Sequence, residues 1–440
     1  MYDVNLKIIS ELKSFVSIVS SSRDILQTFC VANKNFTRNR KLPFSRLVLL
    51  IGKLCKKTLS VELEQFFEEI NYPQSCSVSA FAQQRIKLNP MFFRLWNMVL
   101  WGSYYLYAGN EVKRWKSYRV VAADGSSVSL TNNKVLSDYF GGQSNQQTNF
   151  VLAKTFYYYD VLNELILHSE IRPYRYGEMN MAYDSINEIE EDMLMVYDRN
   201  FCNYKMIALH LWHEKERKFV IRAKETQNII KTFIERGKIS EIVYWETTPS
   251  AKEGMRKSGF VIGKNDRLKV RLVRVELEKS VEVLVTNLWE DEGHPSEQFK
   301  NLYFLRWGIE INISVQKNIL QLESFSGLTV TSVLQDFYAT VMMTNLHSVL
   351  IKDAQKTIDL DKDKRKYPMK INKNKSFGKL KLHIVALFSN EDVETILEKL
   401  HAGFIKYVIP IRKGRSFTRM RKNAQSKSKY KTFSNFKPAY

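Results

Sequence analysis

The sequence predicts a mixed α/β protein, with a central β-sheet and helical regions toward both ends of the chain. Apolar residues recur at helical spacing up to about residue 110, and β-rich runs alternate with helical segments from about 118 to 224. Strand patterns then continue to about residue 287, and helical patterns follow. With 440 residues, 44% of them hydrophobic, the chain can bury the cores of roughly two to four domains.

The net charge is the strongest signal in the composition. The chain carries 67 Lys and Arg against 46 Asp and Glu, a formal net charge of +21. Such a surplus indicates a polyanionic partner, and the absence of a bilayer-spanning run, a lipidation motif or an amphipathic anchor favours nucleic acid over a membrane. Four scattered cysteines and an N-terminus unlike a signal peptide predict a reducing, cytoplasmic location without disulfides or structural zinc.

Residues 1–110 are predicted to form a helical domain. A short helix after Ser77 would display four polar side chains, Gln83, Gln84, Arg85 and Lys87. Side chains of these kinds contact base edges and phosphates in helix-turn-helix proteins. Upstream, Arg38 and Arg40 are candidate phosphate contacts. An ordinary amphipathic helix is the structural alternative for the short helix, and the sequence alone slightly favours it.

Residues 111–224 have the pattern of a sheet with helical crossovers. A short apolar strand ends at Asp124, two β-rich runs follow with a turn at Asn163 between them, and a second buried strand ends at Asp198. Three adjoining strands, followed by helix, strand, helix and strand, are the order of a ribonuclease-H-like sheet. We therefore expect these residues to form the first part of such a core.

The remaining chain is predicted to contain an insertion, the second part of the core and a C-terminal region. Residues 225–287 alternate apolar and basic residues, which predicts a β-rich insertion. Residues 288–350 return to helix and complete the core. Residues 351–440 are expected to hold a helix at about 379–402 and a basic tail from Arg412, with ten Lys and Arg and no acidic residue.

The segment "YFLRWGIEINISVQK" carries four separated polar residues, Tyr303, Arg306, Glu310 and Lys317. On one helix they would share an arc of roughly 60°. The remaining arc is apolar and is expected to be buried: Phe304, Leu305, Ile309, Ile311, Val315 and Ile319. A carboxylate between cations suits a metal ion beside a run of phosphates. The alternative is a simple Arg306–Glu310 pair at i,i+4, worth about 0.2–0.5 kcal/mol.

Three carboxylates are candidates for a common metal site. Asp124 and Asp198 each follow a strand, and ligands bind at strand carboxyl ends in open α/β sheets. The helix of Glu310 could bring a third carboxylate, and three together would repel one another unless they held cations. Mg²⁺ prefers such oxygen ligands, and paired ions support phosphoryl transfer. Alternatively, Asp124 is a turn residue and Asp198 a helix cap.

Several motifs resemble those of the insertion-sequence-4-type DDE transposases. They are "ADGS" at Asp124, "YDRNF" at Asp198, the upstream "LVTNL", and the spacing from Tyr303 to Lys317, which matches the family's YREK signature without a gap. "LPFSRLVLLIGKLCKK" and "VSAFAQQRIKL" resemble its N-terminal region, so the resemblance spans about residues 38 to 327.

The resemblance implies a role for each of these residues. Asp124, Asp198 and Glu310 would be catalytic metal ligands for Mg²⁺, with Mn²⁺ able to substitute. The other three signature residues, Tyr303, Arg306 and Lys317, would contact transposon-end DNA, and residues 1–110 would bind the ends.

The expected function is therefore DNA transposition. The chain would bind inverted-repeat ends, cleave the strands and transfer the 3′-OH ends into target DNA, as a homodimer assembled on double-stranded DNA, in a bacterial cytoplasm at the nucleoid. A ribonuclease-H-like nuclease without strand transfer, and a transposase-derived DNA-binding protein without activity, remain as alternatives.

Overall fold

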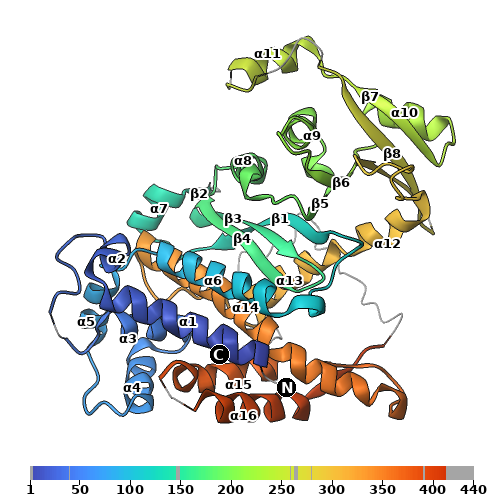
Figure 1. Cartoon of the computed structure of the whole chain (residues 1–440). Coiled ribbons are helices and arrows are strands. Elements are labelled where there is room, and N and C mark those ends of the chain that lie inside the picture. Colours follow the sequence, from blue (N-terminus) through green and yellow to red (C-terminus); the bar gives the residue numbers. More distant parts are fainter. Residues whose placement is uncertain are drawn as a thin grey trace. The chain divides into compact units, whose positions relative to one another are not determined.

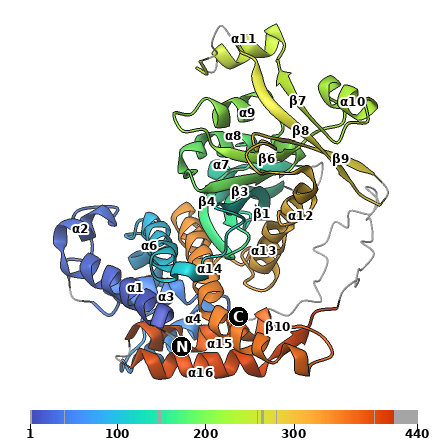
Figure 2. The same cartoon turned by 45° about the vertical axis from the view of Figure 1, so that its right-hand side comes forward.

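The computed structural model describes residues 3–38, 40–144, 149–257, 259–261, 266–278, 280–389 and 392–412, so the predicted basic tail lies almost entirely outside it. By its contacts the chain forms two compact units (Figures 1 and 2). Unit 1 comprises Met1–Gly109 and Ser314–Tyr440, and unit 2 comprises Asn110–Ile313. The predicted N-terminal helical domain and C-terminal region therefore belong to the same unit.

Unit 2 is built on one mixed sheet. Its described strands are β1 (Arg119–Ser129), β2 (Gly142–Ser144), β3 (Asn149–Asp160), β4 (Leu165–Pro173), β5 (Met193–Tyr197), β6 (Lys218–Arg222), β7 (Ser240–Trp245), β8 (Leu268–Glu276) and β9 (Val281–Thr286). Their order is β2-β3-β1-β5-β6-β9-β8-β7, with β4 also paired to β3. The β4-β3-β1 strands are antiparallel, whereas β1-β5-β6 are parallel. The predicted hairpin is present, and Asp160 accepts hydrogen bonds from Asn163 in its turn.

Helices cover both faces of this sheet. The helices in this part of the chain are α7 (Lys134–Phe140), α8 (Glu178–Asp184), α9 (Tyr204–Leu211), α10 (Asn228–Glu235), α11 (Pro249–Lys257), α12 (Phe299–Phe304) and α13 (Trp307–Asn318), and α9 and α12 show the two covered faces. Val196 of β5 packs with Leu302 of α12 in one hydrophobic cluster. Its neighbour Tyr197 hydrogen-bonds His210 of α9 at 3.1 Å. Because successive strand residues point to opposite faces, α12 and α9 lie on opposite sides of the sheet.

The predicted insertion, residues 225–287, extends the same sheet. β9 pairs with β6, and β8 and β7 continue from it. The region also contains α10 and α11, which the strand-like pattern did not predict. The basic residues that alternate along β8 do not all reach solvent, because Arg271 is buried and bonds to Glu290 and Ser296.

Unit 1 is helical and is assembled from both ends of the chain. It contains α1 (Asp3–Ser21), α2 (Arg23–Thr28), α3 (Phe44–Gly52), α4 (Leu59–Glu69), α5 (Val78–Arg85), α6 (Met91–Tyr107), α14 (Val330–Leu360), α15 (Lys373–Ser389), α16 (Val393–Lys406) and a small sheet of β10 (Met369–Ile371) and β11 (Val408–Pro410). The single helix predicted at 379–402 is thus two helices, α15 and α16.

The long helix α14 is the centre of unit 1. It lies beside α6 in both views (Figures 1 and 2), and Asn345 of α14 hydrogen-bonds Asn97 of α6 at 2.7 Å. Its residues are buried almost continuously from Ser332 to Leu350, as expected for a helix surrounded by others. None of the helices in the described ranges is long and apolar enough to cross a membrane.

Candidate active site

Asp124 and Asp198 lie at the same edge of two neighbouring strands. The parallel ladder between β1 and β5 ends at the pair Ala123–Tyr197. Asp124 is the next residue of β1, and Asp198 is the first residue after β5. Asp124 was expected to end its strand, but β1 continues to Ser129 because residues 124–129 stay paired with β3. β1 and β5 are therefore neighbours, and their register brings the two aspartates to the same edge of the sheet. The prediction that the two carboxylates converge requires this register.

Both aspartates lie on the face of the sheet that α12 covers. Val120 and Val196 pack with Tyr303 of α12. Since side chains alternate along a strand, Asp124, four residues after Val120, and Asp198, two residues after Val196, point to that same face. Both carboxylates therefore point toward α12, the helix that precedes α13.

Each aspartate also accepts a local backbone hydrogen bond. Asp124 Oδ1 accepts from the Gly125 N–H at 2.8 Å, and Asp198 Oδ1 accepts from the Asn200 N–H at 2.6 Å. Asp198 thereby caps a short 3₁₀ turn, Arg199–Phe201, so a capping role is present. The bond uses one carboxylate oxygen, and the capping alternative therefore does not exclude a ligand role.

The electrostatic surroundings of Asp124 are unusual for an aspartate. Burial raises its pKa to about 6, against the opposing effects of the Gly125 N–H and of Arg306. Asp198 and Glu178 raise the pKa further, because a second negative charge nearby disfavours ionisation. A carboxyl group poised near neutral pH at a strand end is a feature of functional sites.

The segment that was predicted as one helix consists of two. α12 ends at Phe304 and α13 begins at Trp307, with Leu305 and Arg306 in the turn between them. The turn interrupts the 100° progression of a single helix, so the predicted apolar arc is wrong in part. Phe304 is 70% exposed and Ile311 is 60% exposed, although both were expected to be buried.

The turn directs the guanidinium of Arg306 at two carboxylates. Its Nη2 lies 2.8 Å from Glu310 Oε1, and its Nη1 lies 4.0 Å from Asp124 Oδ2. The side chain is only 7% exposed. The i,i+4 pair of the structural alternative is therefore present, and the same guanidinium also links the α13 glutamate to the sheet aspartate.

Two buried polar atoms beside this cluster lack partners. The phenol oxygen of Tyr303 and Nε of Arg306 make no hydrogen bond with any residue that the structure describes. Burial raises the pKa of Tyr303 to about 12, while Arg306 and Arg222 act to lower it. A buried, unpaired hydroxyl costs about 1–3 kcal/mol, so native proteins rarely keep one without a reason.

One ion pair on the same face was not predicted from the sequence. The ladder of β5 with β6 ends at Tyr197–Ile221, so Arg222 stands in the row of Asp124 and Asp198. Arg222 Nη1 lies 2.9 Å from Glu282 Oε1 on β9. The sequence contains one signal for it. Arg222 ends the apolar run "KFVIR" at the same position at which Asp124 and Asp198 follow the two earlier apolar runs.

The carboxylates fit a hard divalent cation in chemistry, since all three offer only oxygen ligands. In the described part of the chain, however, no three His, Cys, Asp or Glu side chains gather closely enough to hold a metal ion. The Arg306 guanidinium supplies positive charge between Asp124 and Glu310 instead. Asp124, Asp198 and Glu310 therefore offer suitable ligands for Mg²⁺, although their carboxylates do not lie close enough together here to hold one ion.

The other predicted DNA contacts have different surroundings. Lys317 lies in the last turn of α13, whose first turn carries Glu310. Arg38 and Arg40 are exposed and, with Lys34 and Lys87, line a groove of about 260 Å³ in unit 1 that has no acidic lining residue. The phosphate contacts of these two arginines stay a prediction.

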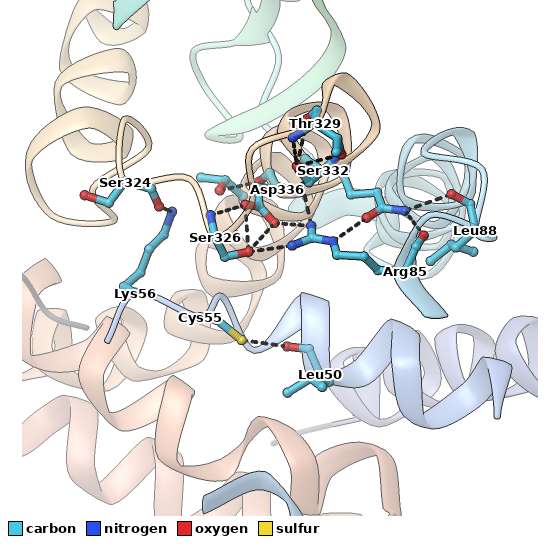
Figure 3. A network of polar contacts seen from close by, with 12 residues as sticks. Leu50, Cys55, Lys56, Arg85, Leu88, Ser324, Ser326, Thr329, Ser332 and Asp336 are labelled. Atoms are coloured by element: carbon cyan, nitrogen blue, oxygen red, sulfur yellow. Dashed lines mark hydrogen bonds and ion pairs between the residues drawn. The ribbon is translucent and has the colours of Figure 1, made fainter. Parts of the chain in front are cut away.

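Arg85, by contrast, is not accessible to DNA in this structure. Its side chain is 3% exposed and pairs with Asp336 at 2.8 Å. Figure 3 shows the guanidinium enclosed by residues of α14 and the segment before it, and it also donates to Gln335, Ser326 and the Ser332 carbonyl. All of these partners are internal, so the DNA contact of Arg85 stays a prediction that this arrangement of the side chain does not favour.

Comparison with known proteins gives a family and several solved structures. Residues 115–346, just over half of the chain, match the family described as "Transposase DDE domain". The cryo-EM structure of a piggyBac transposase synaptic complex with hairpin DNA is similar at 10% identity and a TM-score of 0.41, covering 98% of this chain and 90% of that one. No curated protein matches the chain.

Proposed function

Because the chain belongs to the transposase DDE domain family, we propose that it is a DNA transposase of the insertion-sequence-4 type that cleaves transposon ends and transfers the freed 3′-OH ends into target DNA. The observation that carries this is the row of Asp124 and Asp198 on one face of the sheet, with Arg306 joining Asp124 to Glu310. The strand order β4-β3-β1-β5-β6 supports a ribonuclease-H-like core.

Asp124, Asp198 and Glu310 would hold the divalent cations that transposases of this family generally use, here Mg²⁺ or Mn²⁺. In such sites bound cations lower the pKa of the attacking oxygen and stabilise the leaving one. Arg306 offsets the repulsion between Asp124 and Glu310 before a cation binds. Tyr303 and Arg306 then donate hydrogen bonds to the DNA backbone through their unpartnered groups, and Lys317 contacts a phosphate further along α13.

Residues of unit 1 would bind the transposon ends. The exposed Arg38 and Arg40 line a groove without acidic residues, which suits a phosphate backbone. Cutting and joining two ends requires two active sites, so we propose a homodimer on DNA. Its subunits would meet through α15 and α16, where Leu382 is 67% exposed while most of the neighbouring apolar residues form the core of unit 1. A bacterial cytoplasm with nucleoid DNA is the setting we propose.

A strand-transfer assay separates this function from its alternatives. The purified chain is incubated with Mg²⁺, supercoiled plasmid and a labelled duplex that carries the sequence flanking its gene. We expect label to appear in the plasmid. Cleaved duplex without joined product would identify a nuclease, and binding without cleavage would identify an inactive DNA-binding protein.

A further inference from the structure

The row of strand ends contains a third charged position beyond the two aspartates. Arg222 follows Ile221, which pairs with Tyr197, so it lies beside Asp198 at the next strand. Val220 packs in the same cluster as Tyr303, and Arg222, two residues later, therefore faces α12 as the aspartates do. The side chains at the neighbouring ends of β1, β5 and β6 are therefore a carboxylate, a carboxylate and a guanidinium.

Glu282 is the partner of this guanidinium. Arg222 pairs across the ladder with Leu284, and Glu282 comes two residues before Leu284 in β9, on the same face. The two side chains form an ion pair of 2.9 Å, with Arg222 32% and Glu282 13% exposed. Arg222 is therefore open enough to meet a ligand, while the carboxylate occupies a position on it that an anion could take.

Tyr303 connects the two arginines of the site. Its electrostatic neighbours include Arg306, Arg222, Asp198 and Glu282. Tyr303 is 7% exposed, and both its hydroxyl and Arg306 Nε are without partners among the described residues. Tyr303 and Arg306 thus offer two buried donors beside the partly exposed Arg222. Together these three groups are suited to bind one phosphodiester, because phosphate oxygens accept several charge-assisted hydrogen bonds.

We propose that Arg222, Tyr303 and Arg306 form a phosphodiester subsite beside Asp198, and that Glu282 stands in for the phosphate on Arg222 when no DNA is bound. This inference rests on the proposed function and adds to it a third contact and an internal competitor. DNA binding exchanges a carboxylate for a phosphate on Arg222, so Glu282 lowers DNA affinity while it keeps Arg222 in position.

The test uses the sign of two substitutions in the full-length chain. Binding is measured by fluorescence anisotropy without divalent cations, on a labelled duplex of the gene-flanking sequence and over a range of salt. Arg222→Gln should weaken binding and reduce the slope of log affinity against log salt by about 0.9. Glu282→Gln should strengthen binding several-fold. Arg222→Lys should keep the wild-type slope, because it retains the charge.

A second Arg–Glu pair of unit 2 provides the matched control. Arg236 and Glu241 lie 3.0 Å apart, away from the row of strand ends. Arg236→Gln and Glu241→Gln should leave affinity and slope unchanged, and thermal unfolding checks that every variant is folded. If Arg222→Gln and Glu282→Gln shift affinity in the same direction, or no more than the control pair does, the proposal is overturned.

The variant Arg306→Gln distinguishes a failure of the subsite proposal from a failure of the proposed function. If Arg306→Gln weakens DNA binding and Arg222→Gln does not, only the subsite is wrong. If neither substitution affects DNA binding, the proposed contact of this face with DNA is itself wrong.

Discussion

Two buried arginines, Arg85 in unit 1 and Arg306 in unit 2, differ in how completely their donor groups are paired with partners. In unit 1, Arg85 donates to Gln335, Ser326, Ser332 and Asp336, all of them internal partners. In unit 2, Arg306 reaches Glu310 and Asp124, but its Nε has no partner among the described residues. Burial alone therefore does not distinguish structural from functional arginines.

What distinguishes them is the satisfaction of the neighbouring groups. The Arg85 network closes on itself and joins α5 to α14 and to the segment before α14 (Figure 3). In the Arg306 cluster a tyrosine hydroxyl has no partner among the described residues, and burial raises the pKa of Asp124 although Arg306 acts to lower it. A closed network contributes to folding, whereas an open one retains binding capacity for a ligand.

The largest expected effect concerns the open cluster. Asp124→Asn and Glu310→Gln each remove a ligand charge, so strand cleavage should fall on the order of a thousandfold or more, the equivalent of several kcal/mol of lost charge stabilisation. Binding of the flanking duplex should persist. Cleavage of a labelled duplex at the wild-type rate by either variant would show that the ligand assignment is wrong.

The closed network should respond in stability instead. Arg85→Met leaves Asp336 buried without its partner, and breaking such a pair costs about 3–5 kcal/mol. Arg306→Met should cost less, because Glu310 and Asp124 are more exposed than Asp336. Urea unfolding of both variants measures the difference, and equal losses would remove the contrast between the two arginines.

The raised pKa of Asp124 predicts a pH-dependent stability. A group whose pKa rises on folding, here from 3.8 to about 6, stabilises the fold below the lower value and loses that contribution as pH rises through the higher one. Asp124→Asn cannot ionise. It should gain up to about 3 kcal/mol on the wild type between roughly pH 4 and pH 8, at about 1.4 kcal/mol per pKa unit. A pH-independent difference in urea unfolding would contradict this.

Removing the unpaired hydroxyl should have a smaller effect. Tyr303→Phe keeps the ring and deletes a group without a described partner, so the DNA-free chain should become more stable by about 1–2 kcal/mol. DNA affinity should fall in the same variant. A loss of stability by thermal unfolding would mean that the hydroxyl serves the fold after all.

The smallest expected effect is on the salt dependence of DNA binding. Lys317→Ala and Arg306→Ala should each reduce the log–log salt slope of end binding by about 0.9, the contribution of one phosphate contact. The salt dependence of binding is measured by fluorescence anisotropy, and urea unfolding of each variant reports any separate change in stability. Unchanged slopes in both variants would favour a purely internal role for these cations.

Sequence reasoning was informative where the signal is local. The strand before Asp198 and the turn at Asn163 follow from apolar runs and turn residues, and the structure contains both. It failed where the answer depends on distant partners. Arg85 has the appearance of a surface helix residue, but Asp336, which buries it, lies about 250 residues away.

The candidate site shows the same division. The positions of Asp124 and Glu310 could be read from strand and helix patterns, but the turn at Arg306 could not, because a single helical wheel describes the segment almost equally well. Arg222 was overlooked for a further reason. Its place in the row depends on the registers of β1, β5 and β6, which a sequence without pairing information does not specify.

The division of the chain into two units also has a consequence for its synthesis. Unit 2 is one uninterrupted stretch, whereas unit 1 joins the N-terminal helices to helices made last. At about 5–20 residues per second, the ribosome needs roughly ten to forty seconds to make unit 2 before α14 can emerge. During that interval the apolar side of α6 that α14 will cover has no partner, so a chaperone that shields nascent helices should associate with this chain before unit 1 closes.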